Sequence, residues 1–380
     1  MSSNSKIRVG IVGAGNWAEY GHLPALKLLP EYELSAVFSR DAAKAKALGE
    51  KHGIPHVVDS LDALVSHAEV DLVLVLNPAP SHEAAVRAAI AAGKDVYSEW
   101  PLTPSTASSR ALVQAADQAG VRHLVGLQRR LGSDYRYVRR LLEDGYVGEI
   151  RSVRLHVSVE YFQKERPAKL YFTVPTENFS SLLSIYGGHY FDAIFTMLGY
   201  PDKINALAVN QFKEVTLIET GETLPHTLAD QVIVAGTFPN GAVLSMQLEA
   251  GKRNNYGLQL DITGSKGDLK ISNHTSFGDA INTIEGAQGD GQPMALLPVP
   301  AEFDWLPPNT LGGSPRELAS LYAAYARDRR DGAQLAPTFT DAVRMHELID
   351  AIEAASQGGQ RITLPDWPAY AIKPAASALG

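Results

Sequence analysis

The chain has 380 residues, of which 45% are hydrophobic and 20% are charged, and this composition excludes a largely disordered polypeptide and leaves material for two domains with cores. The formal net charge is −8 and lysine and arginine are dispersed, so we expect no nucleic acid as a partner. There is no cysteine, which excludes disulfides, thiolate nucleophiles and cysteine-based zinc sites.

The N-terminal residues 1–6 are short and polar, and they lead directly into an apolar run without the features of a signal peptide. No apolar stretch approaches the roughly 20 residues that a membrane-spanning helix needs. We therefore expect a cytoplasmic protein that does not enter a membrane.

The first motif is a strand, a glycine turn and a helix. The apolar run Ile7–Val12 leads into Gly13-Ala14-Gly15-Asn16-Trp17-Ala18, and a helical pattern continues to Leu29. In this arrangement Gly13 permits the tight turn, Gly15 lets backbone N–H groups approach a pyrophosphate, and Ala18 is small enough for the helix to pack on the strand. Glycine-rich turns also occur as plain loops, but the flanking strand and helix favour dinucleotide binding.

The second strand, Tyr32–Phe38, ends in Ser39 and Arg40, where NAD-binding domains usually have a carboxylate for the ribose hydroxyls. A cation with a neighbouring hydroxyl suits a 2′-phosphate, so we predict NADP as the cofactor, with NAD possible. Arg40 as a solvated residue at a helix entry is the alternative.

Strands and helices alternate through the rest of the first third, which predicts a parallel sheet covered on both faces. The expected strands are 57–58, 71–76, 95–98 and 123–127, and the expected helices begin near 41 and span 81–92 and 104–119, with a short helix before residue 71. We predict an α/β Rossmann domain, a doubly wound parallel sheet of six strands, over residues 1–130.

After Glu149 alternating strands dominate. They predict a second α+β domain over residues 131–367, with a large, mostly antiparallel open sheet built from 151–161, 203–210, 231–238, 242–248, 257–263 and 268–271. Helices at 180–198, 315–330 and 340–355 are expected to cover one face, which leaves the other for a homodimer or a higher homo-oligomer. Residues 286–292 are expected to form a glycine-rich loop and 368–380 a tail.

With these elements in place, the chain resembles the Gfo/Idh/MocA family, named after glucose–fructose oxidoreductase and inositol dehydrogenase, over nearly its whole length. The resemblance rests on Gly13-x-Gly15, Asn77-Pro78 with His82, Gly93-Lys94-Asp95-Val96, Glu99-Trp100-Pro101 and Gly145-Tyr146-x-Gly148-Glu149-Ile150. Trp100, Leu127-Gln128-x-Arg130 and Gly264-Ser265-Lys266-Gly267-Asp268-Leu269-Lys270 are similar to a branch that contains a transcriptional inhibitor of the galactose pathway in yeasts. The family implies an NAD(P)-dependent oxidoreductase that acts on a small hydroxylated substrate such as a sugar.

The resemblance also implies which residues surround the dinucleotide: Gly13, Gly15, Asn16, Trp17, Ser39, Arg40, Asn77, His82, Glu99, Trp100 and Gln128. Several have a plainer interpretation. Asn77-Pro78 is also typical of a turn that ends a strand, His82 of a first helical turn, and Trp100 of core packing. Their positions after parallel strands favour a ligand, because crevices form at those strand ends.

Catalysis is harder to predict. The family usually has Glu-Lys-Pro where this chain has Glu99-Trp100-Pro101, and an aspartate where it has Ile185. His189 and Asp192 match the family pattern, so we predict His189 as the acid/base, with Asp192 and Tyr186 in support. Gly187-Gly188 is expected to open space around the imidazole.

Candidate substrate ligands are Arg130, Arg166 and Tyr190. No metal site is predicted, because His52 and His56 are separated by Gly53 and Pro55 and are not expected to share a helix face. Two functions stay open: a dehydrogenase that uses His189, and a catalytically silent NAD(P)-binding regulator that acts through protein contacts.

Overall fold

The protein is described by a computed structural model that covers residues 6–254, 257–275 and 282–367. It divides into two compact units, each treated separately below. Among the described residues, the first contains those up to Leu131 together with Trp305–Val343, and the second contains Gly132–Asp304 and those from Arg344 onwards. The predicted tail at 368–380 lies outside the described residues.

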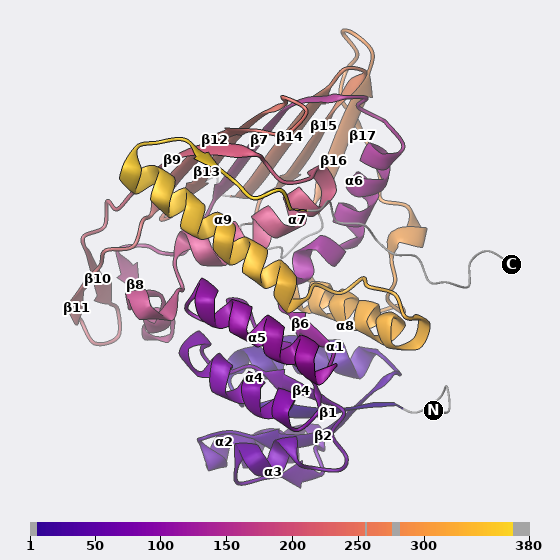
Figure 1. Ribbon diagram of the computed structural model, residues 1–380, viewed down its shortest axis with the longest axis vertical. Coiled ribbons are helices and arrows are strands. Elements are labelled where there is room, and N and C mark those ends of the chain that lie inside the picture. Colours follow the sequence, from indigo (N-terminus) through magenta and orange to yellow (C-terminus); the bar gives the residue numbers. More distant parts are fainter. Residues whose placement is uncertain (1–5, 255–256, 276–281, 368–380) are drawn as a thin grey trace, which may run out of the picture. The chain divides into compact units, whose positions relative to one another are not determined.

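The first unit is built on a sheet whose described strands are all parallel, in the order β3-β2-β1-β4-β5-β6 (Figure 1). The strands are β1 (Ile7–Val12), β2 (Tyr32–Phe38), β3 (His56–Val57), β4 (Leu72–Val75), β5 (Asp95–Ser98) and β6 (His123–Val125). The order reverses between β1 and β4, and such a switch point is where doubly wound sheets form a ligand crevice.

Helices connect these strands, and three of them begin at side-chain caps. They are a π-helical turn η1 (Ala18–His22), α1 (Leu23–Leu28), α2 (Ala42–His52), α3 (Leu61–Val65), α4 (His82–Ala91) and α5 (Thr106–Ala119). The side chains of Asp41, Ser60 and Ser105 accept hydrogen bonds from the first turns of α2, α3 and α5. This confirms the predicted Rossmann fold.

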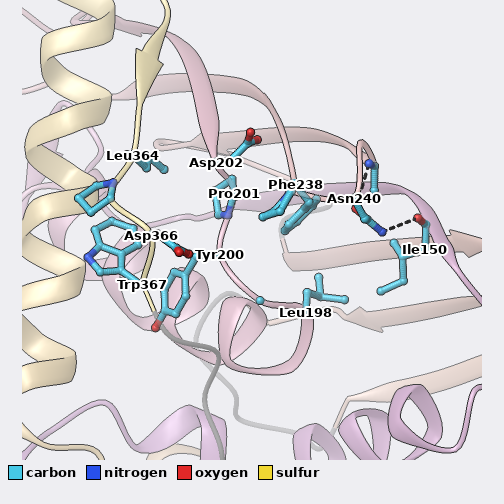
Figure 2. A pocket seen from close by; sticks show the side chains of 14 residues that line it. Ile150, Leu198, Tyr200, Pro201, Asp202, Phe238, Asn240, Leu364, Asp366 and Trp367 are labelled. Carbon is cyan, nitrogen blue, oxygen red and sulfur yellow. Dashed lines mark hydrogen bonds between the residues drawn. The ribbon is translucent and has the colours of Figure 1, made fainter.

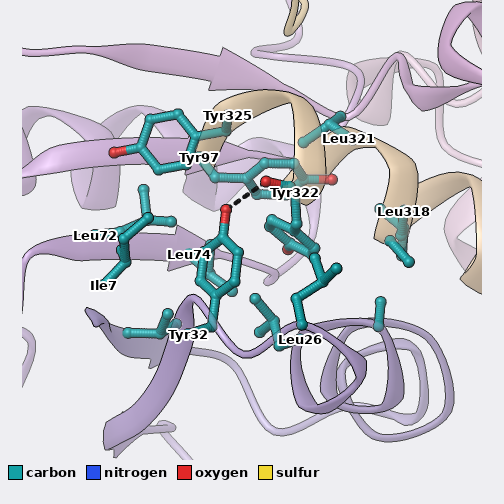
Figure 3. Close-up of a cluster of buried hydrophobic side chains, with 14 of the residues drawn as sticks. Ile7, Leu26, Tyr32, Leu72, Leu74, Tyr97, Leu318, Leu321, Tyr322 and Tyr325 are labelled. Atoms are coloured by element: carbon teal, nitrogen blue, oxygen red, sulfur yellow. Dashed lines mark hydrogen bonds between the residues drawn. The ribbon is translucent and has the colours of Figure 1, made fainter. Parts of the chain in front are cut away.

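Helix α8 (Gly313–Asp331) contributes to the core of the first unit, where it packs on α1 (Figure 3). Its residues Tyr322 and Tyr325 lie among Tyr32 and Tyr97, and the Tyr32 hydroxyl donates to the Tyr322 carbonyl at 2.6 Å. We expected residues 315–330 to cover the second sheet and the second domain to run without interruption to 367. The structure groups 305–343 with the first unit instead, because the apolar face of α8 completes this tyrosine-rich core.

The second unit contains a large sheet that is antiparallel except for one pair. The order of its described strands is β17-β16-β15-β14-β7-β13-β12-β9-β18, and β7 and β13 run parallel. The strands are β7 (Ile150–Ser158), β9 (Lys203–Val209), β12 (Gln231–Thr237), β13 (Val243–Glu249), β14 (Gly257–Gly264), β15 (Gly267–Asn273), β16 (Thr283–Gln288), β17 (Ala295–Leu296) and β18 (Ile362–Thr363). The predicted second fold class is therefore confirmed as a mostly antiparallel, mixed sheet.

Other elements of this unit differ from the prediction or were not predicted. Residues 286–288 belong to β16 rather than to a glycine-rich loop, because Gly286 pairs with Leu269 of β15. A helix α6 (Ser133–Glu143) and a small sheet of β8 (Glu165–Arg166), β10 (Glu214–Leu217) and β11 (Thr223–Pro225) were also missed. The remaining helices are the π-helical turn η6 (Leu183–Gly187), α7 (Gly188–Leu198) and α9 (Phe339–Gly358), which begins in the first unit and continues into the second.

The strands of the large sheet alternate buried and exposed side chains. At the β9, β12 and β13 end the exposed positions include the apolar side chains Leu207, Ile233 and Val243. Lys203, Asn205 and Ser245 are exposed on the same strands. Towards β7 and β14 the exposed positions carry charge, as in the Arg154–Asp261 ion pair at 2.7 Å. Among the described helices, we find none with the length and apolar character needed to span a bilayer.

Candidate functional site

The glycine turn after β1 has the geometry that the motif predicts. Gly13 adopts φ +111°, and a Cβ atom there would lie 3.1 Å from the backbone nitrogen of Asn77, so glycine is required both for the turn and for its approach to the loop after β4. A Cβ at Gly15 would meet nothing within 4 Å. Backbone N–H groups at Gly15 are therefore open to a phosphate, as expected at the start of such a helix.

Two amide side chains follow β4 and β6, the two strands that flank β5. Asn77 follows β4 and donates through Nδ2 to the Ser81 carbonyl at 3.3 Å, whereas its Oδ1 is buried without a hydrogen-bond partner in the described part of the chain. Gln128 follows β6 and is 3% exposed, and its Oε1 is also buried without a partner among those residues. Buried acceptors of this kind are costly unless a donor reaches them, and carboxamide and ribose hydroxyl groups are such donors.

Glu99, which follows β5, is held by a buried hydrogen-bond network. Its Oε1 accepts from His22 Nε2 at 2.7 Å and from the Tyr97 hydroxyl at 2.7 Å. His22 is fully buried, and its Nδ1 lies 2.6 Å from the hydroxyl of Tyr322 on α8. Because an ionised carboxylate only accepts, His22 Nε2 carries the proton of its bond to Glu99.

The network keeps the Glu99 carboxyl ionised. Burial raises its pKa, but hydrogen bonds from His22, Tyr97 and Trp17 and the nearby imidazole outweigh that effect, so the pKa lies below the usual value. The second oxygen, Oε2, faces the turn after β6, where a Cβ atom at Gly126 would lie 3.1 Å away. A negative charge is thus fixed at the carboxyl ends of β5 and β6.

The predicted cofactor residue Trp17 belongs to this network as well. Its ring packs edge-on to His22 at 5.4 Å and lies so close to Gly21 that a Cβ there would be 2.5 Å from the ring. The adjoining turn η1 is π-helical, a feature that is frequent at functional sites. Asn16, beside Trp17, is exposed at the same turn.

His82 joins two loops of the first unit. Its Nε2 lies 2.5 Å from the Asn77 carbonyl, and its Nδ1 lies 2.9 Å from the carbonyl of Pro101. Burial lowers the pKa of His82, and the hydrogen bonds to the carbonyls of Asn77 and Pro101 oppose that effect. Trp100 is 5% exposed and precedes Pro101 through a cis peptide bond. In this arrangement His82 connects the loops after β4 and β5.

The NADP prediction rests on Ser39 and Arg40, which directly follow β2. Arg40 is exposed, and no ion pair to it is present within the described ranges. The nearby Asp41 is occupied as the cap of α2: its carboxylate accepts from the Lys44 amide, which holds its pKa below the usual value. Ser39 Oγ accepts from the Asp41 amide at 3.2 Å.

Arg130, predicted as a substrate ligand, is 6% exposed and lies 3.4 Å from Asp341 in the first unit. Arg129 beside it lies 3.3 Å from Glu317 on α8. Both guanidinium groups are paired with acidic side chains of the segment 305–343, so their observed contacts are structural.

In the second unit the three predicted catalytic residues are close in sequence and buried. Tyr186 lies in η6, and His189 and Asp192 follow in α7, three residues apart and therefore on one face. His189 is 7% exposed and Asp192 is fully buried in a helix that is otherwise almost entirely apolar. Tyr190, a predicted substrate residue, is also buried.

Gly187, the first of the two glycines before His189, does not open space as we expected. A Cβ atom at Gly187 would lie 3.0 Å from Phe191 and 3.2 Å from Leu248 of β13. Gly187 therefore allows close packing of η6 on the large sheet. This tight contact fixes the start of α7 and with it the backbone that carries His189.

Arg166 lies inside the small sheet rather than on an open loop. Its guanidinium donates to the Gln163 carbonyl at 2.9 Å, to the Thr173 hydroxyl at 2.8 Å and to His226 Nε2 at 3.3 Å. Burial lowers its pKa to about 10, and Asp230 opposes that effect. These contacts give Arg166 a structural role in the β8 region, so we do not carry it forward as a substrate ligand.

A cluster of possible metal ligands occurs at a place that the sequence did not indicate. His56, His67 and Glu69 present ligand atoms that lie within 4.8 Å of one another. However, His56 Nε2 already bonds to Glu69 at 2.7 Å, and His67 Nδ1 accepts from the Glu69 amide at 3.2 Å. The latter bond leaves the His67 proton on Nε2, so this arrangement is a surface hydrogen-bond cluster and we propose no metal site there.

Both units contain a segment that matches the model of a known protein family. Residues 7–127 match the model of the oxidoreductase family with an NAD-binding Rossmann fold (GFO_IDH_MocA), and residues 135–273 match that of the Gal80p C-terminal domain. The galactose/lactose metabolism regulatory protein GAL80 of Saccharomyces cerevisiae is 27% identical over 315 residues, which cover 76% of this chain and 72% of the relative. The scyllo-inositol 2-dehydrogenase (NADP(+)) IolW of Bacillus subtilis is 23% identical, covering 94% and 96%.

Among solved structures, levoglucosan dehydrogenase in complex with NADH and levoglucosan has a TM-score of 0.83 at 18% identity. The match covers 96% of this chain and all of that one. At this identity the likeness demonstrates the fold. The relatives thus include both dehydrogenases and a regulator.

The Glu99 network yields a prediction for acid stability. The Glu99 pKa is lowered on folding, so the carboxylate stabilises the protein above its unfolded pKa near 4.5, and this contribution is lost as the pH falls through the folded pKa. Glu99→Gln should lower the free energy of unfolding at pH 7 by about 1.5–3 kcal/mol, the range for hydrogen bonds to a charged group. In this variant the free energy of unfolding should also fall less steeply below pH 4.5 than in the unaltered protein.

Urea unfolding at a series of pH values measures both effects. Glu50→Gln is the matched control, because Glu50 is exposed on α2 with only a 3.8 Å contact to Lys46. Equal behaviour of the two variants would contradict the role assigned to Glu99.

Proposed function

Because the chain belongs to the Gfo/Idh/MocA family, we propose that it is an NAD(P)-dependent oxidoreductase that moves hydride between the cofactor and a hydroxylated substrate, a sugar or sugar derivative. The observation that carries this proposal is the pair of buried amide oxygens of Asn77 and Gln128, which lack donors in the described chain and lie at the strand ends where such cofactors bind. The open backbone at Gly15 supports it.

The residues that would hold the cofactor are those of the first unit. Gly13 and Gly15 would receive the pyrophosphate, Ser39 and Arg40 the 2′-phosphate of NADP, and Asn77 and Gln128 the hydrogen-bond donors of the nicotinamide riboside. Glu99 would hold its charge beside them, oriented by His22. The bound nicotinamide supplies hydride transfer.

His189 is the proposed acid/base in place of the lysine that the family usually has at position 100. An imidazole can take the proton of an alcohol as hydride leaves carbon, and return it in the reverse direction. Asp192 would orient the ring and Tyr186 would assist as a phenol donor, with Tyr190 beside the substrate. The position of His189 and Asp192 supports this role, because they lie three residues apart on one face of α7 and both are buried.

The first test of the function is turnover. Purified protein should change nicotinamide absorbance when it is given NADP or NAD with a panel of sugars, sugar acids and polyols. His189→Ala should lower kcat by about 10²–10⁴, the usual contribution of a general acid/base, and leave the Kd for the cofactor within about twofold. His189→Asn keeps a polar side chain of similar size and should be equally slow.

His156→Ala is the control, because His156 is a half-exposed histidine of β7 in the same unit. Its kcat should match that of the unaltered protein. An undiminished rate for both His189 variants would remove His189 from the mechanism.

The cofactor preference has its own test. Arg40→Ala should raise the Kd for NADP about tenfold, since it removes a charge-assisted contact to phosphate, and should leave the Kd for NAD within about twofold. Lys46→Ala removes another exposed cation from the same unit and should change neither value. A parallel weakening of NAD and NADP by Arg40→Ala would contradict the assignment.

The second candidate function is a catalytically silent NAD(P)-binding regulator that acts through protein contacts. It is favoured by the 27% identity to GAL80 together with tryptophan at position 100 and isoleucine at position 185. Cofactor binding without turnover, in either direction and at high protein concentration, would select this candidate. The same binding with turnover that depends on His189 would select the enzyme.

We also propose that the chain forms a homodimer or a higher homo-oligomer through the exposed apolar end of the large sheet. Leu207 and Ile233 are paired across β9 and β12 and are 55% and 45% exposed, and Val243, 55% exposed, lies farther along the neighbouring strand β13. Exposed apolar side chains grouped in this way are typical of an interface. Sedimentation at micromolar concentration should give an oligomer, and Ile233→Glu should shift it towards monomer. Val57→Glu, at an exposed valine of the first unit, should leave the mass unchanged.

A further inference from the structure

The second unit contains a pocket of about 560 Å³ that takes no part in the proposed chemistry (Figure 2). It lies where α7 ends, β9 begins and the turn between β12 and β13 approaches the chain after β18. All of its lining residues belong to this unit. The volume is in the range of small-molecule sites.

Aromatic rings form part of the wall. Tyr200 and Trp367 meet edge to face with ring centroids 5.2 Å apart, and Phe238 lines the pocket farther along. Figure 2 shows Tyr200 and Trp367 in one part of the pocket and Phe238 in another. The indole N–H of Trp367 donates to Glu347 at 3.0 Å, which fixes the ring and adds an acidic group behind it.

The charged groups in the lining are carboxylates. Asp202 and Asp366 both line the pocket, and no lysine, arginine or histidine is among its described lining residues. A hydrogen bond from the Thr237 hydroxyl, at 2.7 Å, holds the pKa of Asp202 below the usual range, so this group is ionised at neutral pH. Lys203 lies 3.5 Å from Asp202 and offsets part of its charge, whereas Asp366 is exposed. The lining therefore disfavours an anion.

The remaining polar groups are largely occupied. Asn240 donates to the Ile150 carbonyl at 3.3 Å and accepts from the Ala242 amide at 3.1 Å. Asp202 already accepts from Thr237. A sugar or polyol needs several directed hydrogen bonds to its hydroxyls, and few groups are left to make them. A cation needs only negative charge and aromatic faces, and both are present.

We propose that this pocket binds a small organic ammonium ion with an apolar body. The ammonium group lies near Asp366 and the rings of Tyr200 and Trp367, and the apolar body lies along Pro201 and Phe238. The inference is independent of the proposed dehydrogenase or regulator function, because it uses none of the residues assigned to either.

The test compares three probes of the same size by ligand-observed NMR titration of the full-length protein: phenethylamine, 2-phenylethanol and phenylacetate. Phenethylamine should bind at least tenfold more tightly than the neutral alcohol, and phenylacetate should bind more weakly still. Equal binding of the amine and the alcohol, or no binding of the amine at millimolar concentration, would overturn the proposal.

Variants locate the ammonium group. Asp366→Asn should weaken phenethylamine binding about threefold or more, as expected for loss of one exposed charge partner. Asp290→Asn removes an equally exposed carboxylate from the turn after β16 and should have no effect. Trp367→Leu should weaken the amine more than the alcohol. Equal effects of the two aspartate variants would refute the assigned site, and because both positions are exposed this comparison does not depend on a core substitution.

Discussion

The organisation of the first unit depends on a buried carboxylate. An ionised group such as Glu99 is costly to remove from water, and only directed hydrogen bonds make its burial tolerable. Those bonds come from His22 after the glycine turn and from Tyr97 on β5, and His22 is held in turn by Tyr322 on α8. A single charge thus fixes the positions of three elements at the edge of the sheet where the cofactor crevice is expected.

This requirement also explains why α8 belongs to the first unit. Tyr322 contributes its hydroxyl to His22 and its backbone carbonyl to Tyr32, so the helix is held by polar contacts within an apolar cluster. Apolar packing alone would tolerate many positions of α8. Two short hydrogen bonds from one residue define how the helix is rotated about its axis and how far it is shifted along that axis. The ion pair of Arg129 with Glu317 adds a further contact of the same helix.

The sequence was sufficient for features that depend on neighbouring residues. The turn at Gly13 and Gly15, the alternation of strands and helices, and the change to antiparallel strands after Glu149 are all local patterns, and the structure confirms the fold class that they predict. Features that depend on distant residues could not be derived. His22 and Tyr322 are 300 positions apart, and no spacing rule connects them.

The same limit applies to individual residues. Gly187 is expected to open space because its lack of a side chain is visible in the sequence, whereas Leu248, which fills that space, is not a neighbour in the chain. Arg130 and Arg166 are predicted as substrate ligands from their residue type, whereas the contacts that the structure gives them, with Asp341, Thr173 and His226, involve residues that the sequence did not connect with them. The sequence gives the chemical type of a charged residue, whereas its contacts with distant residues are known only from the structure.

The distinction between an enzyme and a regulator lies in a small part of the molecule. A cofactor crevice with Gly15, Asn77 and Gln128 serves either function, since binding a dinucleotide does not require turnover. Proton transfer requires one more group with a suitable pKa, and tryptophan at position 100 cannot supply it. In the second unit His189 and Asp192 are both buried and lie on one face of α7, and an imidazole is a group that can transfer a proton. The retention of this polar pair is the physical reason for favouring catalysis.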